Sequence, residues 1–286
     1  MTKTKVPVSN TVKDLRARVA KWHKAGERVA LIPTMGALHE GHLELVRIAK
    51  RRCDRAITSI FVNPTQFAPT EDFDKYPRTF EDDLAKLASV DGDLVWAPGK
   101  DEMYPQGFAT RIIPAGAAEG LETDFRPHFF GGVATVCCKL FMQALPDIAL
   151  FGEKDYQQLC VVTQMVRDLN LPLEIVGVET VREADGLAMS SRNRYLTAEE
   201  RGKAVTIHHV INKVAAAAAK GRSVETAITD GKAALTAAGF QTIDYVAVRD
   251  AATLKDWDGK SGHTGRVLAA AWLGKTRLID NVAVKP

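Results

Sequence analysis

Two hydrophobic patterns alternate along the first 180 residues. Short, continuous apolar runs of strand length recur at RVALIPT (28–34), AITSIFV (56–62), DLVWAP (93–98), DIALFG (147–152) and LEIVGVE (173–179). Between them, apolar residues at helical spacing run through LELVRIAKRRC, TFEDDLAKLASV, ATVCCKLFMQAL and YQQLCVVTQMVRDLN. An earlier helix is predicted to begin at Ser9-Asn10-Thr11 and to end at Gly26. Strands alternating with amphipathic helices predict an α/β fold, a doubly wound parallel sheet covered on both faces.

The last third of the chain has a different pattern. Residues 197–221 and 223–239 each read as one helix, the first containing an alanine run that strongly favours helix. Strand-like segments follow at QTIDYVAVRD, RVLAAAWLG and TRLIDNVAV. Helices followed by strands predict a smaller α+β domain. We therefore expect a Rossmann-like domain over residues 1–181 and an α+β lid domain over residues 182–286.

Composition narrows the class of protein. The formal net charge is +3 and the basic residues are scattered, which argues against a nucleic-acid partner. The four cysteines form no CxxC pair, so reduced thiols in a reducing compartment are expected. No apolar run approaches 18 residues, so we expect neither a membrane span nor a membrane partner, and a cytoplasmic location.

The segment TMGALHEGH (34–42) lies between the first long strand and its helix, where α/β sheets bind ligands. Gly36 and Gly41 allow close approach of the backbone, and His42 falls near the helix start, where free N–H groups favour an anion. A zinc site would need further ligands and a spacing of four rather than three. A histidine-activated nucleophile lacks a motif such as GxSxG. A structural role for both histidines remains open, but phosphate binding is the favoured hypothesis.

The HxGH motif (His39 to His42) and the segment MSSRN (Met189 to Asn193) together resemble the paired signatures of the class I nucleotidyltransferase and aminoacyl-tRNA synthetase superfamily. Within it, the chain resembles the pantothenate synthetase family over nearly its whole length. The segments that carry the resemblance are IPTMGALHEGHLELV, SIFVNPTQFAPTEDFDKYPRT, GVATVCCKLF, LFGEKDYQQL, VREADGLAMSSRNRYLT and TRLIDN. The resemblance implies ATP-dependent ligation of pantoate to β-alanine through a pantoyl adenylate, giving pantothenate, AMP and pyrophosphate.

The resemblance also assigns residues to ATP. Those implied to act in catalysis are His42, as proton donor, with His39, Lys154 and Arg192 on the phosphates. The full set implied to bind ATP is Met35, Gly36, His39, Gly41, His42, Gly152, Glu153, Lys154, Asp155, Val181, Met189, Ser190, Ser191 and Arg192. Magnesium is expected to be held mainly by the ATP phosphates rather than by protein ligands. The family further suggests a homodimer.

Asn63, Gln66 and Gln158 are implied to bind pantoate and β-alanine. Neutral amides suit a small hydroxy acid and a small amino acid. The alternative function, a nucleotidylyltransferase of the same superfamily acting on a phosphate acceptor, would need cationic residues at these positions. One segment departs from the family pattern RPGHFxG: here it reads RPHFFGG, so His128 receives no role and Arg126 is only a candidate for substrate binding.

Overall fold

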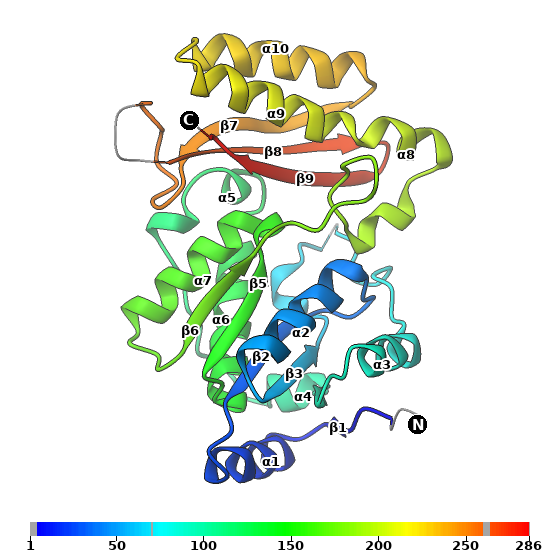
Figure 1. The fold of residues 1–286 in the computed structure, drawn as a ribbon, viewed down its shortest axis with the longest axis vertical. Helices are drawn as coiled ribbons and strands as arrows, with labels where there is room; N and C mark the ends of the chain where they lie inside the picture. Colours follow the sequence, from blue (N-terminus) through cyan, green and yellow to red (C-terminus); the bar gives the residue numbers. More distant parts are fainter. Residues whose placement is uncertain (1–4, 70, 260–263, 286) are drawn as a thin grey trace. The chain divides into compact units, whose positions relative to one another are not determined.

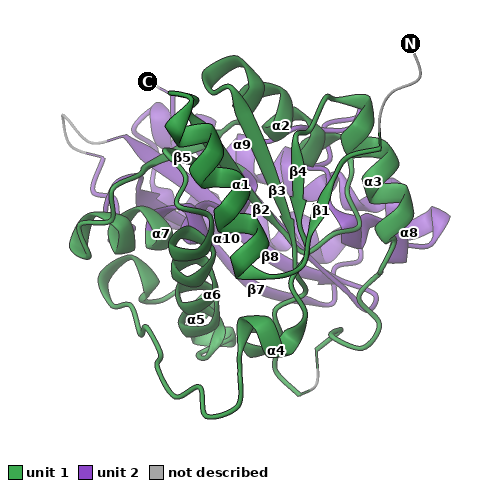
Figure 2. Ribbon diagram, turned by 90° about the horizontal axis from the view of Figure 1, so that it is seen from below, with its two compact units in different colours: residues 1–153, 161–179 green, residues 154–160, 180–286 purple. Residues whose placement is uncertain are grey.

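The computed structural model describes residues 5–69, 71–259 and 264–285. The chain forms two compact units (Figure 2). Unit 1 contains Met1–Glu153 and Val161–Glu179, and unit 2 contains Lys154–Cys160 and Thr180–Pro286. Among the described residues, no helix is long and apolar enough to span a bilayer.

Unit 1 is built on a six-stranded sheet whose strand pairs are all parallel. The order is β1-β4-β3-β2-β5-β6. The strands are β1 (Val8–Ser9), β2 (Val29–Thr34), β3 (Arg55–Ile60), β4 (Leu94–Trp96), β5 (Ile148–Gly152) and β6 (Glu174–Val178). The expected doubly wound α/β class is confirmed. The sequence analysis did not assign β1, which is only two residues long and pairs with β4 at the sheet edge.

Helices cover both faces of this sheet (Figures 1 and 2). One face carries α2 (Glu40–Arg52) and α3 (Phe80–Ser89), and the other carries α1 (Val12–Lys24) and α6 (Phe129–Ala144). Shorter helical elements lie in the connections: η1 (Pro64–Gln66), α4 (Lys100–Met103), η2 (Gly116–Ala118) and α5 (Glu122–Phe125). After β5 the chain forms η3 (Glu153–Asp155) and α7 (Tyr156–Asp168) before it enters β6.

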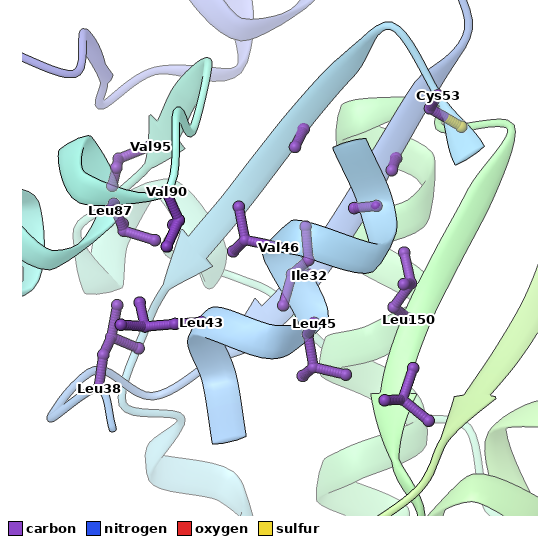
Figure 3. Close-up of a cluster of buried hydrophobic side chains, with 14 of the residues drawn as sticks. Ile32, Leu38, Leu43, Leu45, Val46, Cys53, Leu87, Val90, Val95 and Leu150 are labelled. Carbon is purple, nitrogen blue, oxygen red and sulfur yellow. The ribbon is translucent and has the colours of Figure 1, made fainter. Parts of the chain in front are cut away.

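The core beneath α2 fixes the position of that helix on the sheet. Val46 is fully buried and packs in one cluster with Ile32 of β2 and Leu150 of β5 (Figure 3). Leu43 and Leu38 extend the same cluster toward the start of the helix. Burying a side chain of this size contributes about 1.5–3 kcal/mol. The amino end of α2 is therefore anchored firmly at the carboxyl end of β2.

Unit 2 is an antiparallel sheet in the order β7-β8-β9, with two long helices packed on it (Figure 1). The strands are β7 (Thr242–Asp250), β8 (Gly265–Leu273) and β9 (Thr276–Ala283). The two long helices are α9 (Thr206–Ala219) and α10 (Val224–Ala237), and the shorter α8 (Ala198–Ala204) precedes them. A short helix, η4 (Ser191–Tyr195), precedes α8. The expected smaller α+β architecture is confirmed.

The prediction of a single helix over residues 197–221 is wrong, because the structure divides this segment into two helices at Val205. The backbone of Val205 stays in the right-handed region, but its N–H contacts Lys203 O, which lies nearer along the chain than the partner that an α-helix requires. Val205, Thr206 and Ile207 form a run of β-branched residues, which lose side-chain freedom in a helix. The local sequence thus favours a break in the helix at Val205. The strongly helix-forming alanine run further along led to the prediction of a continuous helix.

The strand order places the ends of three strands side by side. From β2, the chain adds β3 and then β4 on one side of this strand. It then returns and adds β5 and β6 on the other side. The switch in direction falls between β2 and β5. In open α/β sheets, ligands bind outside the carboxyl ends of the strands at such a switch point. The segments beginning at Met35, Asn63 and Glu153 all follow these adjacent strands.

Candidate active site

The HxGH turn forms the start of α2. His39 is the N-cap in extended conformation, and its carbonyl accepts the His42 N–H at 2.8 Å. The His39 N–H in turn donates to His42 Nδ1 at 3.3 Å, and the two ring centroids lie 4.1 Å apart. Because Nδ1 accepts this bond, a neutral His42 carries its proton on Nε2. The turn thus holds His42 as an Nε2–H donor at a helix start, where an anion is favoured.

The loop before the helix is held by a carboxylate from α3. Asp83, only 1% exposed, accepts the Ala37 N–H at 2.9 Å and the Leu38 N–H at 2.8 Å. Lys86, one turn further along α3, donates to Leu38 O at 2.8 Å. The loop that is expected to contact ATP is therefore fixed by α3 as well as by its own helix.

Gly36 allows this arrangement for two reasons. Its φ of +81° lies in the left-handed region, which favours glycine. A Cβ at this position would lie 3.1 Å from Ile60 Cγ2 and 3.2 Å from Asp83 Oδ2. The Gly36 N–H donates to Thr34 Oγ1 at 3.2 Å, which closes the turn at the end of β2. A side chain at Gly36 would disturb both the turn and the carboxylate that holds it.

The two amide residues after β3 form a buried pair. Asn63 is 1% exposed and Gln66 is 8% exposed. Asn63 Nδ2 donates to Gln66 Oε1 at 3.0 Å, and Gln66 Nε2 lies 3.4 Å from Met35 Sδ. The structure therefore brings Gln66 next to Met35, so that predicted site residues after β2 and β3 are in contact.

Arg126, in the segment RPHFFGG, lies near this pair. The Arg126 guanidinium forms a two-point ion pair with Glu71 at 2.8 and 2.6 Å, and packs over the Phe129 ring at 3.9 Å. Its remaining contact toward the amide pair is a 3.4 Å hydrogen bond to Gln66 O. His128 is exposed at the N-cap of α6. Arg126 thus supports the backbone of Gln66, and a direct role in binding substrate stays a prediction.

The GEKD turn is anchored through its backbone. Gly152 ends β5, and Glu153, Lys154 and Asp155 form η3. Lys154 O accepts a hydrogen bond from Asn281 Nδ2 at 2.9 Å, and its ammonium lies 3.6 Å from Asp155 Oδ1. Gln158 is partly buried on α7, one turn beyond this anchor.

The MSSRN segment follows a narrow hairpin in unit 2. The Met189 N–H donates to Val181 O at 3.0 Å, so these two predicted adenosine contacts lie on facing arms. Ser190 then caps η4: its Oγ accepts the Arg192 N–H at 3.2 Å. Asn193 Nδ2 donates to Ala188 O at 3.1 Å and so ties the short helix to the hairpin. The loop is folded by its own side chains rather than left open.

A dipeptide of β9 connects these two elements of unit 2. Asp280 binds Arg182 in the hairpin, with bonds of 2.7 and 2.9 Å. Asn281, the next residue, donates to Lys154 O and accepts from Arg266 Nε at 2.7 Å. One strand thus positions both the turn that carries Lys154 and the hairpin that leads to Ser190.

The comparisons with known proteins agree on one family. The family model described as pantoate-beta-alanine ligase matches residues 7–283. The chain belongs to the pantoate–β-alanine ligase family. It is 59% identical over 277 residues to the pantothenate synthetase of Mesorhizobium japonicum, covering 97% of each chain. It is 55% identical over 279 residues to that of Caulobacter vibrioides, covering 97% of this chain and 98% of the relative.

Solved structures of pantoate–β-alanine ligases share the fold. The crystal structure of pantothenate synthetase from Thermus thermophilus matches with a TM-score of 0.90 and 45% identity, covering 98% of this chain and 100% of that one. The ligase from Francisella tularensis, complexed with "Beta-gamma ATP and Beta-alanine", matches with a TM-score of 0.81 and 32% identity, covering 97% of each chain. These comparisons favour the ligase over the nucleotidylyltransferase alternative.

Sequence reasoning missed the residues that hold the predicted site segments in place within each unit. Asp83, Arg182, Asp280 and Asn281 are largely buried polar groups that bind backbone or one another. A partial signal existed for Asp83, since it lies on the apolar side of an otherwise amphipathic helix. For Asp280 and Asn281 the signal was the TRLIDN segment, which carried the family resemblance without an assigned role.

The HxGH turn offers hydrogen-bond donors of the kind that bind phosphate. In residues 5–69, 71–259 and 264–285, no group of three or more His, Cys, Asp or Glu side chains could hold a metal ion. The HxGH turn instead presents an Nε2–H and the N–H groups of a helix start. Such donors bind phosphoryl oxygens directly.

Proposed function

We propose that this chain joins pantoate to β-alanine, consuming ATP and releasing AMP and pyrophosphate. The family match over residues 7–283 supports the reaction class, and the Francisella ligase complex supports ATP and β-alanine as ligands. The observation that carries the proposal is the His39–His42 arrangement, which fixes His42 as a donor at the start of α2.

The first step activates the carboxylate of pantoate. A carboxylate is a poor electrophile, so one of its oxygens attacks the α-phosphorus of ATP, and the bond from that phosphorus to pyrophosphate breaks. Negative charge builds on the leaving oxygen. His42 Nε2–H donates to this oxygen, with His39 beside it on the phosphates. Preorganised donors of this kind typically contribute about 10²–10³ in rate.

The GEKD turn and the MSSRN segment carry the cations and hydroxyls that the proposal needs. In our proposal, Lys154 binds the phosphates and the pantoate carboxylate, while Arg192 makes two-point contacts with phosphate oxygens. The hydroxyls of Ser190 and Ser191 bind the same phosphates. Val181 and the backbone of Met189 lie against the adenine, and Asp155 binds the ribose.

The second step forms the amide. The uncharged amine of β-alanine attacks the acyl carbon of pantoyl adenylate, the bond from that carbon to AMP breaks, and the amine loses a proton. This step needs no protein nucleophile, because alignment alone gives an effective concentration of roughly 10⁵ M or more. In our proposal Gln66 and Gln158 hold the two organic substrates for it, and Asn63 acts by binding Gln66.

Magnesium enters this proposal as part of the nucleotide. The donors of the HxGH turn match phosphate oxygens, so Mg²⁺ would be coordinated by ATP itself and neutralise its charge. We further propose a homodimer in a reducing, cytoplasmic compartment. The four cysteines form no CxxC pair, which supports such a compartment. Light scattering of the purified chain tests the dimer.

Isotope exchange and mass spectrometry test the function. The chain is incubated with ATP, Mg²⁺ and pantoate, and exchange of labelled pyrophosphate into ATP is measured with and without pantoate. We expect exchange only with pantoate, and pantothenate with stoichiometric AMP once β-alanine is added. Release of ADP, or exchange that needs a phosphorylated acceptor instead of pantoate, would contradict the proposal.

A further inference from the structure

The amide of Asn63 is held in one orientation by two backbone groups. Its Oδ1 accepts the Thr65 N–H at 3.3 Å, and its Nδ2 donates to Gly132 O at 3.2 Å. A backbone N–H can only donate and a backbone carbonyl can only accept. Exchanging the oxygen and nitrogen of Asn63 would therefore break both bonds. The orientation of this amide follows from the fold and not from an arbitrary assignment.

The orientation of Asn63 determines that of Gln66. Asn63 Nδ2 lies 3.0 Å from Gln66 Oε1, so the Gln66 oxygen must face Asn63 as an acceptor. The Gln66 nitrogen then points the other way, toward the side of Met35. Gln66 is thus presented to a substrate as a donor. The Nε2–H groups of Gln66 can pair only with an acceptor, such as a carboxylate or hydroxyl oxygen, and not with an ammonium, which has no acceptor atom.

Tyr104 makes the shortest contact to Asn63. Its hydroxyl donates to Asn63 Oδ1 at 2.8 Å, compared with 3.0 Å from Thr65 Oγ1. Burial raises the pKa of Tyr104, so its hydroxyl keeps the proton that it donates. The ring is held by Phe108 and Phe61, with centroids 5.2 and 6.2 Å away. Tyr104 follows α4, 41 residues along the chain from Asn63, and no sequence pattern linked the two.

We propose that Tyr104 is a positioning residue of the ligase: acting through Asn63, it holds Gln66 as a hydrogen-bond donor to an acceptor oxygen of pantoate or β-alanine. The inference rests on the proposed function and adds the direction of the hydrogen-bond chain, from Tyr104 to Asn63 to Gln66 to substrate. Each donor in such a chain polarises the next. A substrate that offers an ammonium in place of the acceptor oxygen cannot accept a hydrogen bond from Gln66 Nε2 and should bind more weakly.

The test is a double-mutant cycle between Tyr104→Phe and Gln66→Ala. Phenylalanine keeps the ring packing and removes only the hydroxyl. In the wild-type background, Tyr104→Phe should raise the KM of one organic substrate about three- to tenfold, as expected for one hydrogen bond. The KM of ATP should change less than about twofold by the same reasoning. In the Gln66→Ala background the substitution should have no further effect on the organic substrate, because the end of the chain is gone.

Three measurements keep the outcomes distinct. Tyr245→Phe, on β7 of unit 2, is the matched control and should leave all kinetic constants unchanged. A purely structural role of Tyr104 would lower kcat or the thermal midpoint with the KM values unchanged, which would overturn the proposal. An equal effect of Tyr104→Phe in both backgrounds would also overturn it. Calorimetric titration with pantoate needs no turnover: a wild type that binds no pantoate overturns both proposals, whereas an active wild type without coupling overturns this one alone.

Discussion

Asp280 and Arg182 form a two-point ion pair across 98 residues of chain, with nitrogen–oxygen distances of 2.7 and 2.9 Å. Asp280 is 2% exposed, and His208 Nδ1 lies 3.4 Å from Asp280 Oδ2. Burial alone would raise the pKa of this carboxyl. The hydrogen bonds from His208 and Arg182 outweigh burial and hold the pKa below its ordinary value of 3.8. The charged form of Asp280 is therefore the form that the fold requires.

Asp280→Asn should lower the free energy of unfolding by about 3 kcal/mol at pH 7, because it leaves Arg182 without its buried partner. A carboxyl whose pKa is lowered by folding stabilises the protein above its unfolded pKa, and this stabilisation is lost as the pH falls through the folded value. The difference between wild type and variant should thus be full at pH 7 and shrink below pH 3.8. Urea unfolding across this range measures it. Glu199→Gln, which removes an exposed carboxylate paired with Lys203, is the control and should have a smaller effect; an equal effect would refute the argument.

Asp83→Asn should loosen the loop that precedes α2. An amide has one acceptor atom, so either the Ala37 or the Leu38 N–H would face an NH₂ group. Leaving one buried donor unsatisfied costs about 1–3 kcal/mol. We expect lower stability in urea together with a raised KM for ATP. Asp82→Asn changes the exposed neighbour on the same helix and should do neither. If the two variants behave alike, the loop is not held by Asp83.

The sequence predicted the fold well where local pattern and tertiary structure agree. The apolar runs of β2, β3 and β5 are buried on both faces of a parallel sheet, so their hydrophobicity is continuous and easily recognised. Two features of the fold were not predicted. One depends on a partner distant in the sequence, and the other on a local preference that neighbouring residues obscure. β1 exists only through pairing with β4, and the break at Val205 is hidden by the helix-forming residues around it.

The candidate site shows the same contrast between residues in local motifs and residues that act through distant contacts. Residues such as His39, His42 and Lys154 were predicted as site residues because they lie in short motifs. The residues that orient them were not, because Asn281 reaches Lys154 O across 127 positions and Asp83 reaches Ala37 across 46. No periodicity encodes such pairs. The chemistry of a site can thus be visible in motifs while the groups that hold it in place become visible only in three dimensions.

Replacement of His42 tests the donor at the start of α2. His42→Asn keeps an acceptor near the position of Nδ1 for the His39 N–H but has no atom at Nε2. Both His42→Asn and His42→Ala should therefore reduce pantoate-dependent exchange of pyrophosphate into ATP by about 10²-fold or more. The Asn variant should keep wild-type stability. His209→Ala, on the exposed face of α9, serves as the control. Wild-type exchange in the Asn variant would show that the donor at Nε2 is dispensable.

Lys154→Met removes the charge and keeps an unbranched side chain only one atom shorter. Its backbone carbonyl still accepts from Asn281, so the turn should remain in place. Adenylate formation should fall about 10²-fold or more, because one preorganised cation is lost from the phosphates. Lys213→Met, an exposed position on α9, is the matched control. A loss confined to thermal stability, with exchange intact, would assign Lys154 to structure rather than chemistry.

Gly131 and Gly132 are adjacent in α6, so that a substitution at Gly131 is a control for the same substitution at Gly132. A Cβ on Gly132 would lie 2.5 Å from Thr65 O and 2.8 Å from Gln66 Cα, whereas a Cβ on Gly131 would meet only Ile112 O at 3.8 Å. Gly132→Ala must displace backbone, because neither neighbour is the end of a flexible side chain. It should cost about 1–3 kcal/mol of stability and raise the KM of an organic substrate by moving Gln66. Gly131→Ala should be neutral or stabilising, since alanine favours helix over glycine by about 1 kcal/mol. Urea unfolding and steady-state kinetics of both variants measure the contrast, and equal behaviour would mean that α6 does not set the position of Gln66.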